Sequence, residues 1–81
     1  MLQHNPSRRV ALTNVDKEIL DLLREGRATQ SYIVDEIGRS RQYVHNRLGI
    51  LTAAGYLENI HPKTALYELV GDPLADEENG G

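Results

Sequence analysis

The sequence contains no cysteine, no tryptophan and no phenylalanine, and four tyrosines are its only large aromatic side chains. Without cysteine, disulfide bonds and thiolate metal ligands are excluded, and the chain fits a reducing compartment. No apolar run approaches the ~20 residues that a membrane-spanning helix needs, and the first residues have no signal-peptide character. We therefore expect a soluble, cytoplasmic protein without membrane contact, whose 81 residues form one small domain.

Positive charge is also scarce. The sequence has nine Lys and Arg and twelve Asp and Glu, which gives a net charge of −3 at pH 7. This balance argues against a nucleic-acid partner, since nucleic-acid binders usually carry a basic surface. The distribution of the charges argues the other way. Four of the acids lie in the last ten residues, and residues 39–57 contain three arginines and no carboxylate. A segment free of acids within an acidic chain predicts a surface suited to a polyanion.

Motifs for catalysis and for metal binding are missing as well. The sequence has no phosphate-binding loop and no G-x-S-x-G nucleophile motif. Its three histidines, His4, His45 and His61, stand in separate segments at spacings that fit no metal site. We therefore expect no enzymatic activity, no metal, no cofactor and no small-molecule ligand.

The middle of the chain predicts three short helices, each with a polar cap and an apolar stripe. The first begins near Thr13 or Asn14 and ends at Gly26. The second follows Thr29, and the third begins at Ser40. The residues expected in the three stripes are Val15, Ile19, Leu22 and Leu23, then Ile33, Val34 and Ile37, then Val44, Leu48 and Leu51.

Two glycines mark places where the chain changes direction. Gly38 supplies the sharp turn between the second and third helices, because glycine reaches left-handed backbone angles without steric cost, and Gly55 ends the third helix. Beyond it, residues 56–60 and 65–69 alternate like two strands of a hairpin, joined by residues 61–64. The chain thus divides into an N-terminal arm (1–12), a folded domain (13–70) and an acidic, flexible tail (71–81).

The order helix, helix, glycine turn, helix, hairpin resembles the winged helix-turn-helix superfamily over about residues 13–69. The most specific parts are Ile-Gly-Arg-Ser-Arg-Gln-Tyr-Val-His-Asn-Arg-Leu at 37–48 and Leu-Thr-Ala-Ala-Gly-Tyr-Leu at 51–57. The resemblance implies an α+β, mainly α fold of three helices plus a C-terminal β-hairpin wing. Arg39 departs from the pattern, because the position after the turn glycine is usually apolar. Either its stem packs beneath a solvated guanidinium, or the guanidinium points toward phosphate.

The same resemblance implies that helix 40–54 enters the major groove of DNA, with wing 61–64 against the backbone or the adjacent groove. With Val44, Leu48 and Leu51 inward, a rotation of about 100° per residue leaves a polar outward face. The expected base contacts are Arg41, Gln42, His45 and Asn46. The expected phosphate contacts are Thr29, Gln30, Ser31, Arg39, Ser40, Tyr43 and Arg47, with His61 and Lys63 in the wing.

The implied function is a sequence-specific DNA-binding transcriptional regulator, a repressor, whose partner is double-stranded DNA. A homodimer would supply the specificity that one short half-site lacks, with the first helix and the arm as its surface. Arg8 and Arg9 would be a minor-groove arm or plain surface charge. The composition and the motifs are similar to small haloarchaeal phage-repressor-like regulators, which implies an archaeal, halophilic source. The alternative is a winged-helix protein-protein interaction module without sequence-specific DNA binding.

Overall fold

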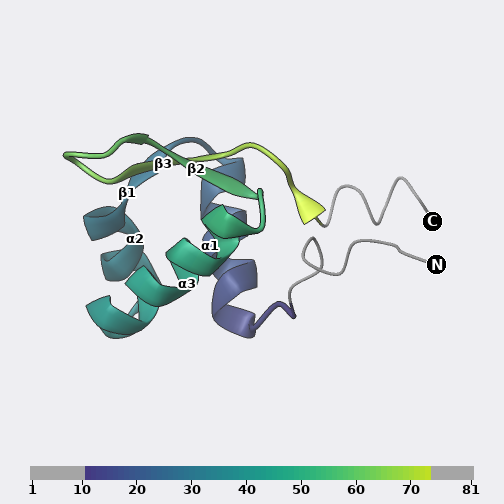
Figure 1. The fold of residues 1–81 in the computed structure, drawn as a ribbon. Coiled ribbons are helices and arrows are strands. Elements are labelled where there is room, and N and C mark those ends of the chain that lie inside the picture. The colour runs from purple at the N-terminus through teal and green to yellow at the C-terminus, as the bar shows by residue number, and fades with distance from the viewer. Residues whose placement is uncertain (1–10, 74–81) are drawn as a thin grey trace.

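Three helices lie beneath a small antiparallel sheet in the computed structural model, which describes residues 11–73 (Figure 1). The elements are α1 (Asn14–Arg24), β1 (Ala28–Thr29), α2 (Gln30–Ile37), α3 (Arg41–Ala53), β2 (Leu57–His61) and β3 (Leu66–Leu69). The predicted helices and hairpin are therefore confirmed. Within residues 11–73, no helix combines the length and the apolar character that crossing a membrane requires. The predictions for His4, Arg8 and Arg9, and for residues 74–81 of the tail, lie outside the described residues.

Each helix begins where a hydroxyl side chain can accept a hydrogen bond from a backbone N–H of the first turn. Thr13 caps α1, Thr29 caps α2 and Ser40 caps α3, and each of the three bonds measures 3.1 Å. In α1 the capping is reciprocal, because the Asp16 carboxylate also accepts from the backbone N–H of Thr13 at 2.9 Å. Short-range hydrogen bonding thus sets all three helix starts at the positions that the sequence predicts.

The turn between α2 and α3 depends on Gly38. Its backbone adopts φ 76° and ψ 21°, a left-handed conformation, and its N–H donates to the carbonyl of Val34 at 3.0 Å. A side chain at this position would be strained whatever the space around it. The glycine turn is therefore confirmed, and it sets the direction in which α3 leaves α2.

The apolar core lies between the three helices and the sheet. Val44, Leu48 and Leu51 are fully buried in α3, as predicted, and Ile33 is fully buried in α2. Val34 and Ile37 of α2 are half-buried against the core, as is Leu22 of α1, whereas Leu20 of α1, which the expected stripe did not include, is fully buried. The physical reason is that α1 packs against α2, α3 and β3 together, so its buried face is wider than a single stripe.

The sheet has three strands in the order β1-β3-β2, all antiparallel, and β1 was not predicted. Its two residues pair with β3, Ala28 opposite Tyr67 and Thr29 opposite Leu66. Both hairpin strands begin one residue later than expected, β2 also ends one residue later whereas β3 ends at Leu69 as expected, and a bulge falls between Asn59 and His61. Since β1 leads directly into α2, the sheet ties the wing to the start of that helix.

Candidate functional site

The outward face of α3 carries the largest group of predicted site residues. Arg41, Gln42, His45 and Asn46 are all exposed there, in the first two turns of the helix. Arg41 makes no ion pair with any residue of the 11–73 segment. The structure therefore brings the four expected base contacts together on one accessible surface.

Hydrogen bonds between side chains order part of this surface. The Gln42 amide donates to the Asn46 carboxamide oxygen at 3.1 Å, one helical turn apart. The His45 ring nitrogen Nδ1 lies 3.1 Å from Oε1 of Gln30, at the start of α2. The first bond runs along α3 and the second joins α3 to α2. Both restrict rotamers that an isolated surface side chain would be free to sample.

Gly49 lies one turn beyond Asn46 on the same face. A Cβ placed on it would meet nothing within 4 Å apart from its chain neighbours and the nearby backbone of its own helix, and its backbone lies in ordinary helix. Glycine inside a helix costs roughly 0.5–1 kcal/mol relative to alanine. Packing within the described domain gives no reason for this cost. A side-chain-free position on an exposed polar face instead permits another molecule to approach the helix backbone closely.

The turn that precedes α3 presents three further candidates. Arg39 is exposed, so the core closes without a side chain at that position. Ser40 is exposed, and its hydroxyl caps α3 by accepting from the backbone N–H of Tyr43. Tyr43 itself retains 36% of its surface. The first turn of α3 has backbone N–H groups without a helical acceptor, and the exposed Arg39 precedes that turn by two residues, so this end of α3 favours a negatively charged partner.

The start of α2 lies next to both α3 and the wing. Ser31 is exposed, whereas Thr29 and Gln30 are half-buried. Thr29 is occupied as the helix cap, and the backbone N–H of Gln30 donates to the carbonyl of Ala65 at 2.9 Å. The three expected phosphate contacts therefore differ in accessibility, and Ser31 is the most open of them.

In the wing, His61 and Lys63 are both exposed, as a hairpin tip requires. His61 ends β2, and its ring nitrogen Nδ1 lies 2.7 Å from the hydroxyl of Thr64. In the view of Figure 1, the hairpin tip and the turn between α2 and α3 point to the same side of the molecule. The wing and the first turn of α3 can therefore contact one extended partner.

Arg47 was predicted to be a phosphate contact on the surface, but its guanidinium lies against Asp16 of α1. Its Nε donates to Oδ1 of Asp16 at 2.8 Å and its NH2 group to Oδ2 at 2.6 Å, a two-pronged ion pair between α3 and α1. The Asp16 side chain has no exposed surface and that of Arg47 retains 17%. Arg47 therefore holds α3 against α1, and only the N–H groups that Asp16 leaves over can reach a phosphate.

The Asp16 carboxyl is held in its charged form. Burial by itself would raise its pKa, but hydrogen bonds from Arg47 and from Thr13 outweigh burial and lower the pKa below the ordinary value of 3.8. In the sequence, Asp16 stands near the start of the predicted first helix, where its charge favours the helix dipole. The Thr13–Asp16 spacing signals the capping box, whereas no local pattern signals a partner 31 residues away.

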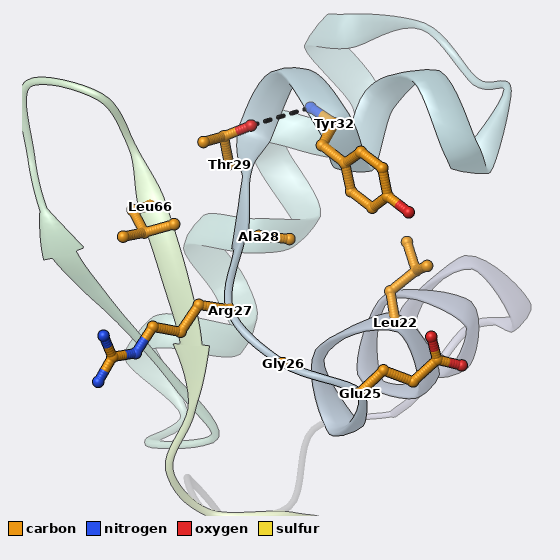
Figure 2. Close-up of a pocket in the computed structure, with 8 residues that line it drawn as sticks. All are labelled: Leu22, Glu25, Gly26, Arg27, Ala28, Thr29, Tyr32 and Leu66. Atoms are coloured by element: carbon orange, nitrogen blue, oxygen red, sulfur yellow. Dashed lines mark hydrogen bonds between the residues drawn. The ribbon is translucent and has the colours of Figure 1, made fainter.

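A hollow lies between the end of α1, β1 and the start of α2 (Figure 2). It is an open depression of about 420 Å³. Tyr32 is 51% exposed and its ring points toward Leu22 across the hollow. Among residues 11–73 no group of three His, Cys, Asp or Glu side chains is placed to hold a metal ion. The lining residues are Leu22, Glu25, Gly26, Arg27, Ala28, Thr29, Tyr32 and Leu66.

Comparison with protein families gives one match. A family described as winged helix-turn-helix DNA-binding matches residues 12–58, more than half of the chain. The matched segment contains all three helices, β1 and the first residues of β2. Comparison with curated proteins and with solved structures gives no match.

Proposed function

Because the chain belongs to the winged helix-turn-helix DNA-binding family, we propose that it is a sequence-specific transcriptional regulator that represses by occupying its site on duplex DNA. In this proposal α3 lies in the major groove and presents Arg41, Gln42, His45 and Asn46 to base edges. Arginine suits the paired acceptors of guanine, and Gln or Asn suits the mixed edge of adenine.

The main support for this proposal is the exposed face of α3. It offers donors and acceptors of the kind that base edges match, it contains no carboxylate, and it includes a glycine that internal packing does not require. A generic solvated helix face would be expected to mix acids with bases. This face excludes the acids although the chain as a whole has more of them than of bases.

The backbone contacts surround α3 on two sides. Ser31 with Thr29 and Gln30 at the start of α2, and Arg39, Ser40 and Tyr43 at the start of α3, meet phosphates of the same groove. Arg47 contributes through the N–H groups that Asp16 does not take. In the wing, His61 and Lys63 meet the neighbouring backbone. These contacts set the register of α3 and carry no base specificity of their own.

A homodimer completes the proposed mechanism. One small domain reads too few base pairs to single out one site among the many that a genome offers, and two half-sites multiply the specificity. The dimer surface is the outer face of α1 with the N-terminal arm, and repression is steric exclusion of polymerase. In a halophilic archaeon, where the Debye length falls to about 3 Å at 1 M salt, base hydrogen bonds replace much of the screened phosphate attraction.

The competing function is a protein-interaction module, which the net charge of −3 favours. Selection of bound fragments from random DNA, over a series of salt concentrations, distinguishes the two. We expect one enriched sequence motif for the regulator. Absence of any retained fragment at every salt concentration would contradict the regulator and favour the module.

Two matched variants make that experiment specific. We expect Arg41→Ala with Gln42→Ala to abolish enrichment, because each base contact contributes about 1–3 kcal/mol of discrimination. Arg27→Ala with Tyr32→Phe removes an exposed arginine and the hydroxyl of an exposed tyrosine, both in the lining of the hollow and outside α1 and α3. We expect this control pair to leave the enriched motif unchanged. Equal losses in both pairs would mean that retention depends on overall charge and not on α3.

A further inference from the structure

An exposed aromatic ring stands at the hollow between α1, β1 and α2. Tyr32 is 51% exposed, the largest exposed fraction among the four tyrosines. Its ring points toward Leu22 of α1 (Figure 2), and both Leu22 and Leu66 of β3 are only half-buried where they line the hollow. Packing within the described domain therefore leaves apolar surface open here, and aromatic residues are enriched in protein interfaces.

The shape of the hollow favours a protein surface over a small ligand. Its volume of about 420 Å³ falls within the range of ligand pockets, roughly 300–1,000 Å³. Such pockets cover about 70–90% of a ligand's surface, whereas this hollow is an open depression. A side chain that projects from a second protein needs no deep pocket, because the surfaces around it exclude the water.

Two charges of opposite sign border the hollow. Glu25 and Arg27 are both exposed, and their charged ends point in opposite directions from the backbone of Gly26 between them (Figure 2). Within residues 11–73 Glu25 makes no ion pair, and Arg27 makes only a loose one, with its Nε 3.7 Å from Oε2 of Glu68. A surface with one positive and one negative side is complementary to its own copy turned by 180°, because a twofold axis places each side over the opposite side of the partner.

The outer face of α1 cannot by itself supply the centre of the homodimer proposed above. The centre of a protein interface is apolar and depleted of charged residues. None of the exposed side chains of α1 is apolar; they are Asn14, Lys17, Glu18, Asp21 and Arg24. The hollow begins at the end of the same helix and contains the apolar side chains that this face lacks.

We propose that a second copy of the chain docks in the hollow about a twofold axis. The two Tyr32 rings pack against each other and against Leu22 of the opposite copy, and Arg27 of each copy lies beside Glu25 of the other. The assignment rests on the proposed homodimer and moves its apolar centre from the outer face of α1 to the hollow.

Docking at Tyr32 leaves the face of α3 that is proposed to read DNA accessible. The side chain of Gln30, two residues earlier in α2, contacts His45 of α3. Side chains two residues apart on a helix point to different sides, so Tyr32 and Gln30 face different neighbours. One copy can therefore hold its partner through one side of α2 and keep α3 free on the other.

A substitution at the start of α2 tests the ring. Tyr32→Asp should weaken dimerisation at least about tenfold, because it puts two carboxylates at the twofold axis in place of two rings. The domain still folds, since an acid is favourable in the first turn of a helix. Tyr43→Asp is the matched control, because Tyr43 is also an exposed tyrosine three residues after a helix cap but lies outside the hollow. We expect the control to leave dimerisation unchanged.

Charge reversal tests the twofold arrangement. Glu25→Arg and Arg27→Glu should each weaken dimerisation, because like charges then meet across the axis, and the two together should restore it. Arg27→Ala with Tyr32→Phe keeps the ring and removes only a charge at the rim, so it changes the dimer affinity by less than about fivefold. This pair thus leaves the DNA-binding dimer in place.

Sedimentation equilibrium of the full chain without DNA, over a series of protein concentrations at low salt, measures dimerisation, and circular dichroism confirms that each variant folds. A monomeric unaltered chain at every concentration, or equal effects of Tyr32→Asp and Tyr43→Asp, would overturn the assignment. Single charge reversals that the combined variant does not restore would exclude the twofold arrangement. Fragment selection separates this inference from the proposed function. A monomer that still enriches a motif removes only the dimer surface, whereas a dimer that retains no DNA removes only the regulator.

Discussion

The two sides of α3 use the same residue type for different purposes. Arg41 faces outward without an ion-pair partner in the 11–73 segment, whereas Arg47, less than two turns later, is held by the buried carboxylate of Asp16. An unpaired guanidinium keeps its donors available for a partner molecule, and a paired one uses them to fix the helix that carries it. The two arginines of this helix therefore differ: Arg41 remains available to a partner, whereas Arg47 positions the helix.

The largest effect on stability is expected when the partner of Arg47 is removed. We expect Asp16→Ala to lower the free energy of unfolding by about 3 kcal/mol, because it leaves a half-buried guanidinium unpaired and also breaks the capping box. Urea denaturation followed by circular dichroism measures the change. Because α3 then loses its anchor on α1, affinity for DNA falls as well.

The matched control for that change is Glu18→Ala, which removes an exposed acid from the same helix. We expect the control to alter the free energy of unfolding by less than about 0.5 kcal/mol. Replacing both partners, with Asp16→Ala and Arg47→Met together, should restore much of the loss, because no unpaired charge remains. Equal stability of Asp16→Ala and Glu18→Ala would show that the ion pair does not hold the helices together.

A smaller effect is expected from a substitution on the outward face of α3. We expect Gly49→Ala to raise the free energy of unfolding by roughly 0.5–1 kcal/mol, because alanine is the better helix former and meets open space. The same substitution should weaken DNA binding, since in the proposed complex the added methyl group lies where the duplex approaches. Thermal unfolding and a binding titration on one protein preparation measure both effects. Gains in both stability and affinity would refute close approach at this position.

The smallest expected effect concerns pH. Because the folded-state pKa of Asp16 lies below its ordinary value of 3.8, the carboxylate stabilises the folded state. That contribution is fully present above about pH 5 and is lost as the pH falls through 3.8 toward the folded-state pKa. We expect the stability difference between the unaltered chain and Asp16→Asn to shrink over this range. A stability difference that stays constant down to about pH 2, roughly two pH units below the ordinary pKa, would exclude the charged pair as its source.

Short-range signals account for what sequence analysis predicted correctly. Thr13, Thr29 and Ser40 each cap through an N–H three residues later, and Gly38 turns within a single residue. Those interactions depend only on neighbours in the chain. The polar outward face of α3 follows likewise from helical periodicity once its apolar stripe is known. The sequence alone therefore determined the three helices and the hairpin, their order and the composition of the candidate surface.

Tertiary structure determined which contacts fix the outward face of α3 in its position. The pairing of Arg47 with Asp16, the contact of His45 with Gln30 and the two-residue strand β1 all join segments more than ten residues apart. None leaves a local pattern, because each exists only after the helices and the hairpin have packed. Packing also determines which arginine of α3 is free to bind and which is used to position, since burial beside one carboxylate separates two side chains of identical chemistry.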